Sequence, residues 1–322
     1  MHLPDGFLDA KTAAAAQVLA WTGVAVALRQ VRSSLEPRRV PLLGLAAAFV
    51  FAAQMINFPV AGGTSGHLLG GVLTAVLLGP AAAVLVMTTV LLVQCLMFAD
   101  GGLLALGANV FNMALVGVGG GYLVFRLVRR LVPMEERRST VFAAAFAGWV
   151  STVLASLSCA GQLALSGTVP WSIAFPAMVG VHMLIGIGEG VATGLIVLAV
   201  MESRPELVAG EKDRSAGGAA GFIAWGLLVS LGLAIFVAPF ASPWPDGLER
   251  VAKSFGFEHK AAQSFFPAPA PDYQIPLFGS ATVTTAIAGL VGTLIAFAGA
   301  WVLARLTVPV LRSRGENAAG GR

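Results

Sequence analysis

The chain has 322 residues, of which 57% are hydrophobic and only 11% are charged. Soluble globular domains carry about one quarter charged residues, so this composition excludes an ordinary soluble protein and predicts a protein that crosses the membrane several times. The formal net charge of +4 comes from cations gathered in a few connecting segments. Such clustering is typical of membrane topology rather than of nucleic-acid binding.

About nine apolar stretches are long enough, or nearly long enough, to cross a bilayer. In chain order they cover 12–30, 41–58, 67–79, 81–99, 103–125, 140–165, 173–201, 218–240 and 281–305. The third stretch is short and ends at Gly79-Pro80, so we expect a partial or tilted span there. The fold class is therefore an all-α polytopic membrane protein, with a seven-helix bundle followed by a two-helix hairpin.

Basic residues mark one face of the membrane. They follow the first, fifth, seventh and last stretches, at Arg29, Arg32, Arg38, Arg39, Arg126, Arg129, Arg130, Arg137, Arg138, Arg204, Lys212, Arg214, Arg305, Arg312 and Arg314. The positive-inside rule makes this face cytoplasmic. We therefore expect the N-terminus outside and the C-terminus inside.

A polar segment divides the chain into two parts. Residues 202–217, ESRPELVAGEKDRSAG, have the composition of a flexible cytoplasmic linker between a first domain, 1–201, and a second domain, 218–322. The two spans of the second domain enclose an external loop, 241–280, which contains PDGLERVAKSFGF and PDYQIP. A loop of this length usually has a function or contacts another part of the protein.

The sequence lacks the motifs of common nucleotide-binding and hydrolytic sites. It contains no G-x-x-x-x-G-K-[ST], no H-E-x-x-H and no G-x-S-x-G. The interiors of the predicted spans are also poor in acidic residues, with Glu189 as the one clear case. This scarcity argues against a proton relay.

The start of the chain has the residues of a metal chelate. A histidine at position 2 preserves Met1, because removal of the initiator methionine requires a small second residue. The Met1 amine, the backbone nitrogen of His2 and His2 Nδ1 can then bind one ion through a five-membered and a six-membered ring. Nitrogen ligands that include a deprotonated amide favour a tetragonal or square-planar ion, Ni(II) or Cu(II). The alternative is a frayed end without a function.

His67 is the candidate for the missing fourth ligand. It follows a glycine-rich stretch at the outer end of the third span, on the same predicted face as His2. Three further residues are expected around the ligands, namely Asp5, Asn57 and Ser65. Asp5 belongs to a Pro-Asp-Gly turn that would lead the chain into the mouth of the bundle, and it could hydrogen-bond His2 or the amine. Ordinary turn chemistry explains Asp5 at least as well.

The other polar residues in the spans have structural explanations. His182 and Glu189 lie seven residues apart on one helix face and could form a buried pair, which we expect to lie away from the outer mouth. His259 falls in the external loop and is expected to be solvated. Hydrogen bonds between helices explain Gln94, Asn109 and Asn112.

Four motifs together resemble a known transporter family. MHLPDGFL, GGTSGHLLGG, QCLMFADGGLLALGANVFNMALVG and VHMLIGIGEG occur in the order seen in the NikM/CbiM family, the metal-binding membrane components of energy-coupling-factor (ECF) importers. The resemblance covers about residues 1–201. It implies that Met1, His2 and His67 bind the metal through the amine, the His2 backbone and side chain, and the His67 side chain.

The second part of the chain resembles the small N component of the same importers. This resemblance covers residues 218–310 and implies a fused M–N protein in the cell membrane of a prokaryote. It also implies separate partners, a transmembrane coupling protein and an ATPase, which would account for the missing nucleotide-binding loop. No permanently bound cofactor is expected, because the metal is the cargo. The start MHLPDGF resembles nickel proteins more than cobalt proteins, so Ni(II) is favoured over Co(II).

Two other classes of function stay open. A stand-alone secondary transporter needs carboxylates for a coupling ion at the membrane midplane and paired broken helices, and the sequence has little of either. A membrane metallohydrolase needs a general base beside its metal, for which Asp5 is the one obvious candidate.

Overall fold

The computed structural model describes residues 1–208, 219–262, 267–275 and 279–309. The α-helices are α1 (Ala10–Ser34), α2 (Val40–Gln54), α3 (Gly71–Leu78), α4 (Pro80–Phe98), α5 (Leu106–Asn109), α6 (Gly121–Leu131), α7 (Glu136–Leu165), α8 (Trp171–Ser203), α9 (Ala219–Gly232), α10 (Gly247–Phe255) and α11 (Ala281–Thr307). Shorter 3-10 or π segments are η1 (Pro37–Arg39), η2 (Val110–Gly120), η3 (Pro205–Leu207), η4 (Leu233–Val237), η5 (Ala238–Phe240), η6 (Glu258–Lys260) and η7 (Pro271–Tyr273). Strands β1 (Phe58–Val60) and β2 (Thr64–Gly66) form an antiparallel pair.

Seven helical segments of the described chain are long and apolar enough to cross a membrane. They are Ala10–Ser34, Pro80–Phe98, Leu106–Leu131, Glu136–Leu165, Trp171–Ser203, Ala220–Phe240 and Ala281–Thr307. The prediction of an all-α polytopic membrane protein is thereby confirmed. Of the nine stretches expected from the sequence, α2 has 15 residues and α3 has 8, fewer than the roughly 20 of a full span. Helix α2 ends before the β1–β2 hairpin. Helix α3 is the partial span that the sequence predicts before Gly79-Pro80.

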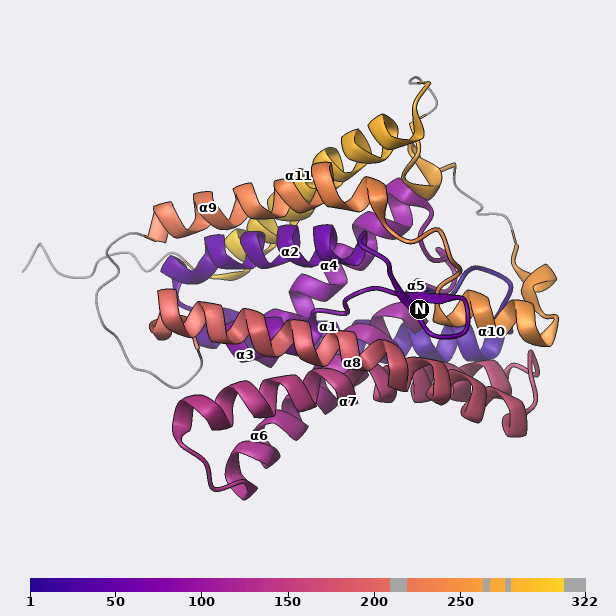
Figure 1. The fold of residues 1–322 in the computed structure, drawn as a ribbon, viewed down its shortest axis with the longest axis horizontal. Helices are drawn as coiled ribbons and strands as arrows, with labels where there is room; N and C mark the ends of the chain where they lie inside the picture. The colour runs from indigo at the N-terminus through magenta and orange to yellow at the C-terminus, as the bar shows by residue number, and fades with distance from the viewer. Residues whose placement is uncertain (209–218, 263–266, 276–278, 310–322) are drawn as a thin grey trace, which may run out of the picture.

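The long helices run roughly along one axis of the molecule. Helices α9 and α11 lie with α2 along one side, and α6 and α7 lie along the other, with α3 and α4 between (Figure 1). The N-terminus and α10 lie near one end of the bundle. The basic connections α1–α2 and α6–α7 lie at the opposite end (Figure 1). Four of the basic residues named above fall outside the described residues, namely Lys212, Arg214, Arg312 and Arg314.

The two loops expected from the sequence are described in part. Of the linker at 202–217, the first residues complete α8 and form η3, and residues 209–217 lie outside the described residues. The external loop at 241–280 contains α10, η6 and η7, and its residues 263–266 and 276–278 lie outside the described part. Helix α10 begins with a capping box, in which the carboxylate of Asp246 accepts from the backbone N–H of Glu249.

A row of glycines brings α8 close to α7. Gly186, Gly190 and Gly194 are spaced four residues apart on α8, and a Cβ at Gly190 would lie 2.6 Å from the carbonyl oxygen of Ala145. Small residues at this spacing allow close helix packing in membranes.

Glu189 of α8 binds the start of α3. Its carboxylate accepts hydrogen bonds from the backbone N–H groups of Leu69 (2.5 Å) and Gly70 (2.9 Å). These donors precede a helix and would otherwise lack acceptors in a membrane interior. The pair predicted between Glu189 and His182 is wrong, because His182 Nδ1 instead donates to the carbonyl oxygen of Met178 at 2.7 Å.

Replacing Glu189 is expected to destabilise the protein. In Glu189→Leu the N–H groups of Leu69 and Gly70 lose their acceptor, and each buried donor left unsatisfied costs about 1–3 kcal/mol. Glu189→Gln keeps one acceptor oxygen and should lose less. Thermal unfolding in one detergent compares the variants, and a Glu189→Leu protein as stable as the wild type would contradict this assignment.

Candidate metal-binding site

The N-terminal segment turns back into the bundle at a tight turn. Gly6 has a φ of +90°, and a Cβ there would lie 2.2 Å from the carbonyl oxygen of Lys260, so the turn requires glycine. The carboxylate of Asp5 accepts from the backbone N–H groups of Leu104 (2.8 Å) and Ala105 (3.0 Å). Asp5 thus anchors the turn to the start of α5, and within the described chain it makes no hydrogen bond to the first two residues.

Asn109 of α5 fixes the position of the first residues. Its side chain accepts from the backbone N–H of Leu3 at 2.8 Å and donates to the Leu3 carbonyl oxygen at 3.1 Å. Leu3 is fully buried and Met1 is only 6% exposed. The start of the chain is therefore a fixed part of the bundle and not a frayed end.

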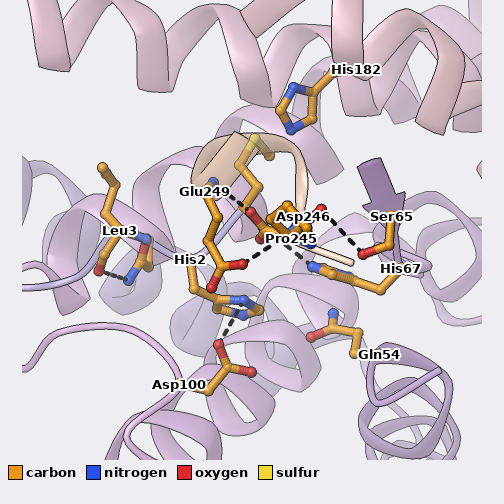
Figure 2. A network of polar contacts seen from close by, with 12 residues as sticks. His2, Leu3, Gln54, Ser65, His67, Asp100, His182, Pro245, Asp246 and Glu249 are labelled. Atoms are coloured by element: carbon orange, nitrogen blue, oxygen red, sulfur yellow. Dashed lines mark hydrogen bonds and ion pairs between the residues drawn. The ribbon is translucent and has the colours of Figure 1, made fainter. Parts of the chain in front are cut away.

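The Met1 amine lies between a carboxylate and an imidazole. It donates to Asp246 Oδ2 at 2.5 Å and lies 3.3 Å from His67 Nε2. His67 Nδ1 donates to the carbonyl oxygen of Leu68 at 3.0 Å, which leaves the lone pair of Nε2 toward the amine. The rings of His67 and His2 stack, with 5.4 Å between their centroids. The structure thus brings together the three residues that the sequence proposes as ligands. Figure 2 shows two of them, His2 and His67, side by side.

Both ring nitrogens of His2 have polar neighbours. Nδ1 lies 3.1 Å from Asp100 Oδ1, and Nε2 lies 3.1 Å from Gln94 Oε1. The other oxygen of Asp100 accepts from the Tyr273 hydroxyl at 2.7 Å. The backbone N–H of His2 makes no hydrogen bond to any described residue, so this nitrogen is available as a ligand.

Main-chain nitrogen atoms adjoin the two histidines. In the described ranges, no three His, Cys, Asp or Glu side chains lie close enough to hold an ion. The amine of Met1 and the amide of His2 are the main-chain nitrogens that could add to the two imidazole rings.

Burial and charge set the protonation of these groups. Burial lowers the pKa of His67 and of His2, which favours their neutral, metal-binding forms. Burial also opposes the charges of the Met1 amine and Asp246, but the charge attraction and the hydrogen bond between the two groups, with smaller contributions from their neighbours, together outweigh it. As a result the pKa of the amine is raised and the pKa of Asp246 is lowered. A metal ion that binds the amine must displace its proton.

Two cavities border the candidate ligands. The smaller has a volume of about 20 Å³ and is lined by Met1, His67, His182 and Asp246, among others; it has room for one particle the size of a water molecule. The larger, of about 670 Å³, borders His2 and His67. Its charged lining consists of the carboxylates Asp100, Asp246, Glu249, Glu258 and Asp272 and the single amine Lys253. The excess of carboxylates favours cations in this cavity.

The external loop covers the ligands. Asp246 lies at the start of α10 beside Met1, and a Cβ at the next residue, Gly247, would lie 2.8 Å from His182 Nε2. The hydroxyl of Ser65 donates to the carbonyl oxygen of Trp244 at 2.7 Å. Ser65 therefore fastens the covering loop and does not itself touch the candidate ligands by a hydrogen bond in the described structure.

The structure adds residues that sequence reasoning did not assign to the site. His182 lines the small cavity, contrary to the expectation that it lies away from the mouth. Asn57, which the sequence analysis does expect around the ligands, lines the large cavity, and its Oδ1 is buried without a partner among the described residues. The one feature of the sequence that draws attention to Asp246 is the Pro-Asp-Gly-Leu-Glu motif of the external loop, and this motif did not indicate a place in the site. His259 is exposed, as predicted.

Comparisons with known proteins agree with this architecture. Residues 2–207 match the family model for the cobalt uptake substrate-specific transmembrane region, and residues 220–308 match the PDGLE domain. A protein of Archaeoglobus fulgidus named as a fused nickel transport protein is 34% identical over 307 residues, which cover 95% of this chain and 98% of that protein. The fused nickel transport protein NikMN of Rhodobacter capsulatus is 38% identical over 225 residues, which cover 65% of this chain and 64% of its own length. The crystal structure of a truncated transition metal transporter, 35% identical, matches with a TM-score of 0.57 over 63% of this chain and 99% of its own.

Proposed function

The chain belongs to the family of cobalt-uptake substrate-specific transmembrane proteins, and from that premise we propose that it captures Ni(II) for import through Met1, His2 and His67. In this proposal, residues 1–201 form the metal-binding domain and residues 218–322 form a two-span domain whose external loop covers the site. Co(II) is the alternative cargo, because the family description names cobalt whereas the two fused relatives carry nickel in their names.

One observation carries the proposal: the Met1 amine is buried 3.3 Å from His67 Nε2. The proposed ligands are this amine, the backbone nitrogen of His2, His2 Nδ1 and His67 Nε2. Four nitrogen atoms, one of them a deprotonated amide, suit the planar preference of Ni(II). Binding releases the protons of the amine and the amide, and His2 Nδ1 must exchange its contact with Asp100 for the ion.

Release of the ion inside requires a source of energy outside this chain. We propose that a transmembrane coupling protein and an ATPase supply it, in the cell membrane of a prokaryote. The absence of a nucleotide-binding loop from the sequence supports separate ATPase subunits. In this scheme the transported ion is a substrate, and the protein keeps no resident cofactor.

Reconstituted transport tests the proposal against a stand-alone secondary transporter. We expect liposomes that contain this chain with its coupling protein and ATPase to accumulate radioactive nickel only when ATP is supplied. Liposomes with the chain alone should bind the ion without accumulating it. Nickel accumulation by the chain alone, driven by a proton or sodium gradient, would show that the protein is a secondary transporter.

A further inference from the structure

We propose that Tyr273, in the Pro-Asp-Tyr segment of the external loop, holds the carboxylate of Asp100 against the ring of His2 and is thus a positioning residue for the site. The consequence for the metal rests on the proposed function, whereas the placement of His2 is a property of the metal-free protein. In the sequence this segment is only part of a long external loop. In the structure it reaches a candidate ligand through one carboxylate.

The carboxylate of Asp100 bridges two residues that are far apart in the chain. Its Oδ1 lies 3.1 Å from His2 Nδ1 (Figure 2), and its Oδ2 accepts from the Tyr273 hydroxyl at 2.7 Å. Within the part of the chain that the structure describes, no other side chain bonds this carboxylate. The Asp100 side chain is 29% exposed and lines the large cavity, where a contact with the imidazole alone would be weak. Tyr273 therefore fixes the direction in which the carboxylate faces.

Stacked aromatic rings hold Tyr273 in place. Its ring is nearly parallel to that of Phe98, with 14° between the planes and 4.6 Å between the centroids. The centroid of the Phe51 ring lies 6.3 Å away. Phe51 of α2 and Phe98 of α4 are fully buried in the bundle. The tyrosine hydroxyl is therefore presented to Asp100 by a rigid aromatic platform.

The backbone on both sides of this hydrogen bond has a conformation that most residues avoid. Of the non-glycine residues that the structure describes, three have a positive φ, namely Ala99 (54°), Asp272 (53°) and Tyr273 (58°). Ala99 directly precedes Asp100, and Asp272 directly precedes Tyr273. A left-handed backbone is unfavourable for alanine and tyrosine, and it persists where the surrounding structure requires it, often at functional sites. Its presence at both ends of one bond indicates that this local structure serves the placement of the Asp100 carboxylate.

The tyrosine gives the external loop a second connection to the candidate ligands. Near the start of the loop, Asp246 accepts from the Met1 amine. Near its end, Tyr273 reaches His2 through Asp100. Tyr273, Asp100 and His2 all line the large cavity. When an ion replaces Asp100 at His2 Nδ1, the Tyr273 hydroxyl keeps the displaced carboxylate close by, where its negative charge compensates part of the charge of the ion.

Tyr273→Phe tests the proposal because it keeps the stacked ring and removes only the hydroxyl. In the full, metal-free chain, NMR of carbon-13-labelled histidine should show shifted ring signals for His2 and unchanged signals for His259. Nickel affinity should fall about 10-fold, as is typical when a residue that orients a ligand is lost. Tyr122→Phe is the matched control. Tyr122 is the one other tyrosine of the sequence, and it lies in α6 and borders neither cavity, so its variant should match the wild type in both measurements.

A double-mutant cycle separates this role from a merely structural one. If Tyr273 acts through Asp100, Tyr273→Phe should lower nickel affinity in the wild-type background and have no further effect in Asp100→Ala. An equal loss in both backgrounds overturns the proposal, as do His2 ring signals in Tyr273→Phe that match those of the wild type. Failure of the proposed function is a separate result: the wild-type protein would bind no nickel, while Tyr273→Phe would still shift the His2 ring signals.

Discussion

A protein extended by several glycine and serine residues ahead of Met1 is expected to lose nickel affinity by on the order of 1,000-fold, or about 4 kcal/mol of binding free energy. The extension converts the amine into an amide and so removes a ligand. The added residues also have little room, because Met1 is only 6% exposed and the adjoining cavity has a volume of only about 20 Å³. Equilibrium dialysis with metal analysis measures the loss. A one-residue extension is unsuitable, because it would create a new chelate with two amides before His2.

Two matched proteins control this comparison. The same glycine and serine residues added at the C-terminus should leave nickel affinity unchanged. An N-terminal extension with a protease site that restores Met1 as the first residue should recover affinity after cleavage. If the extended, uncleaved protein binds nickel as tightly as the native one, the Met1 amine is not a ligand.

His67→Ala is expected to reduce nickel affinity by about 100-fold or more, because it removes a ligand held in place by its own bond to Leu68. The Met1 amine also loses its neighbour at 3.3 Å. His259→Ala is the matched control, since His259 lies exposed in the loop that covers the site. Isothermal titration with nickel compares the two variants. Equal affinities would remove His67 from the ligand set.

The sequence predicts most of the helices, and it predicts that the first residues of the chain lie beside His67, because these features depend on local patterns. Apolar length locates the spans, and the short stretch before Pro80 predicts the partial helix α3. The turn at Gly6 and the position of His2 behind Met1 are likewise local features. The chelate hypothesis follows from the chemistry of adjacent nitrogen atoms and needs no knowledge of the fold.

Contacts between distant segments could not be predicted in this way. The bond from Met1 to Asp246 joins the first residue to the external loop of the second domain, and no pattern in one sequence pairs those residues. A glutamine inside a span, such as Gln94, has the same appearance whether it bonds a helix or a ligand. His182 and Glu189 show the limit of helix periodicity. The spacing places both on one face of α8. In the structure, however, His182 bonds the carbonyl oxygen of Met178, and Glu189 bonds the start of α3.

The central claim is that the ion binds to nitrogen atoms supplied mainly by the start of the chain. X-ray absorption at the nickel edge tests it most directly, on the protein with its native N-terminus and one bound ion. We predict a planar four-coordinate spectrum with a first shell made of nitrogen alone, and its loss in the N-terminally extended protein. A six-coordinate, oxygen-rich shell, or a spectrum that survives the extension unchanged, would contradict the account.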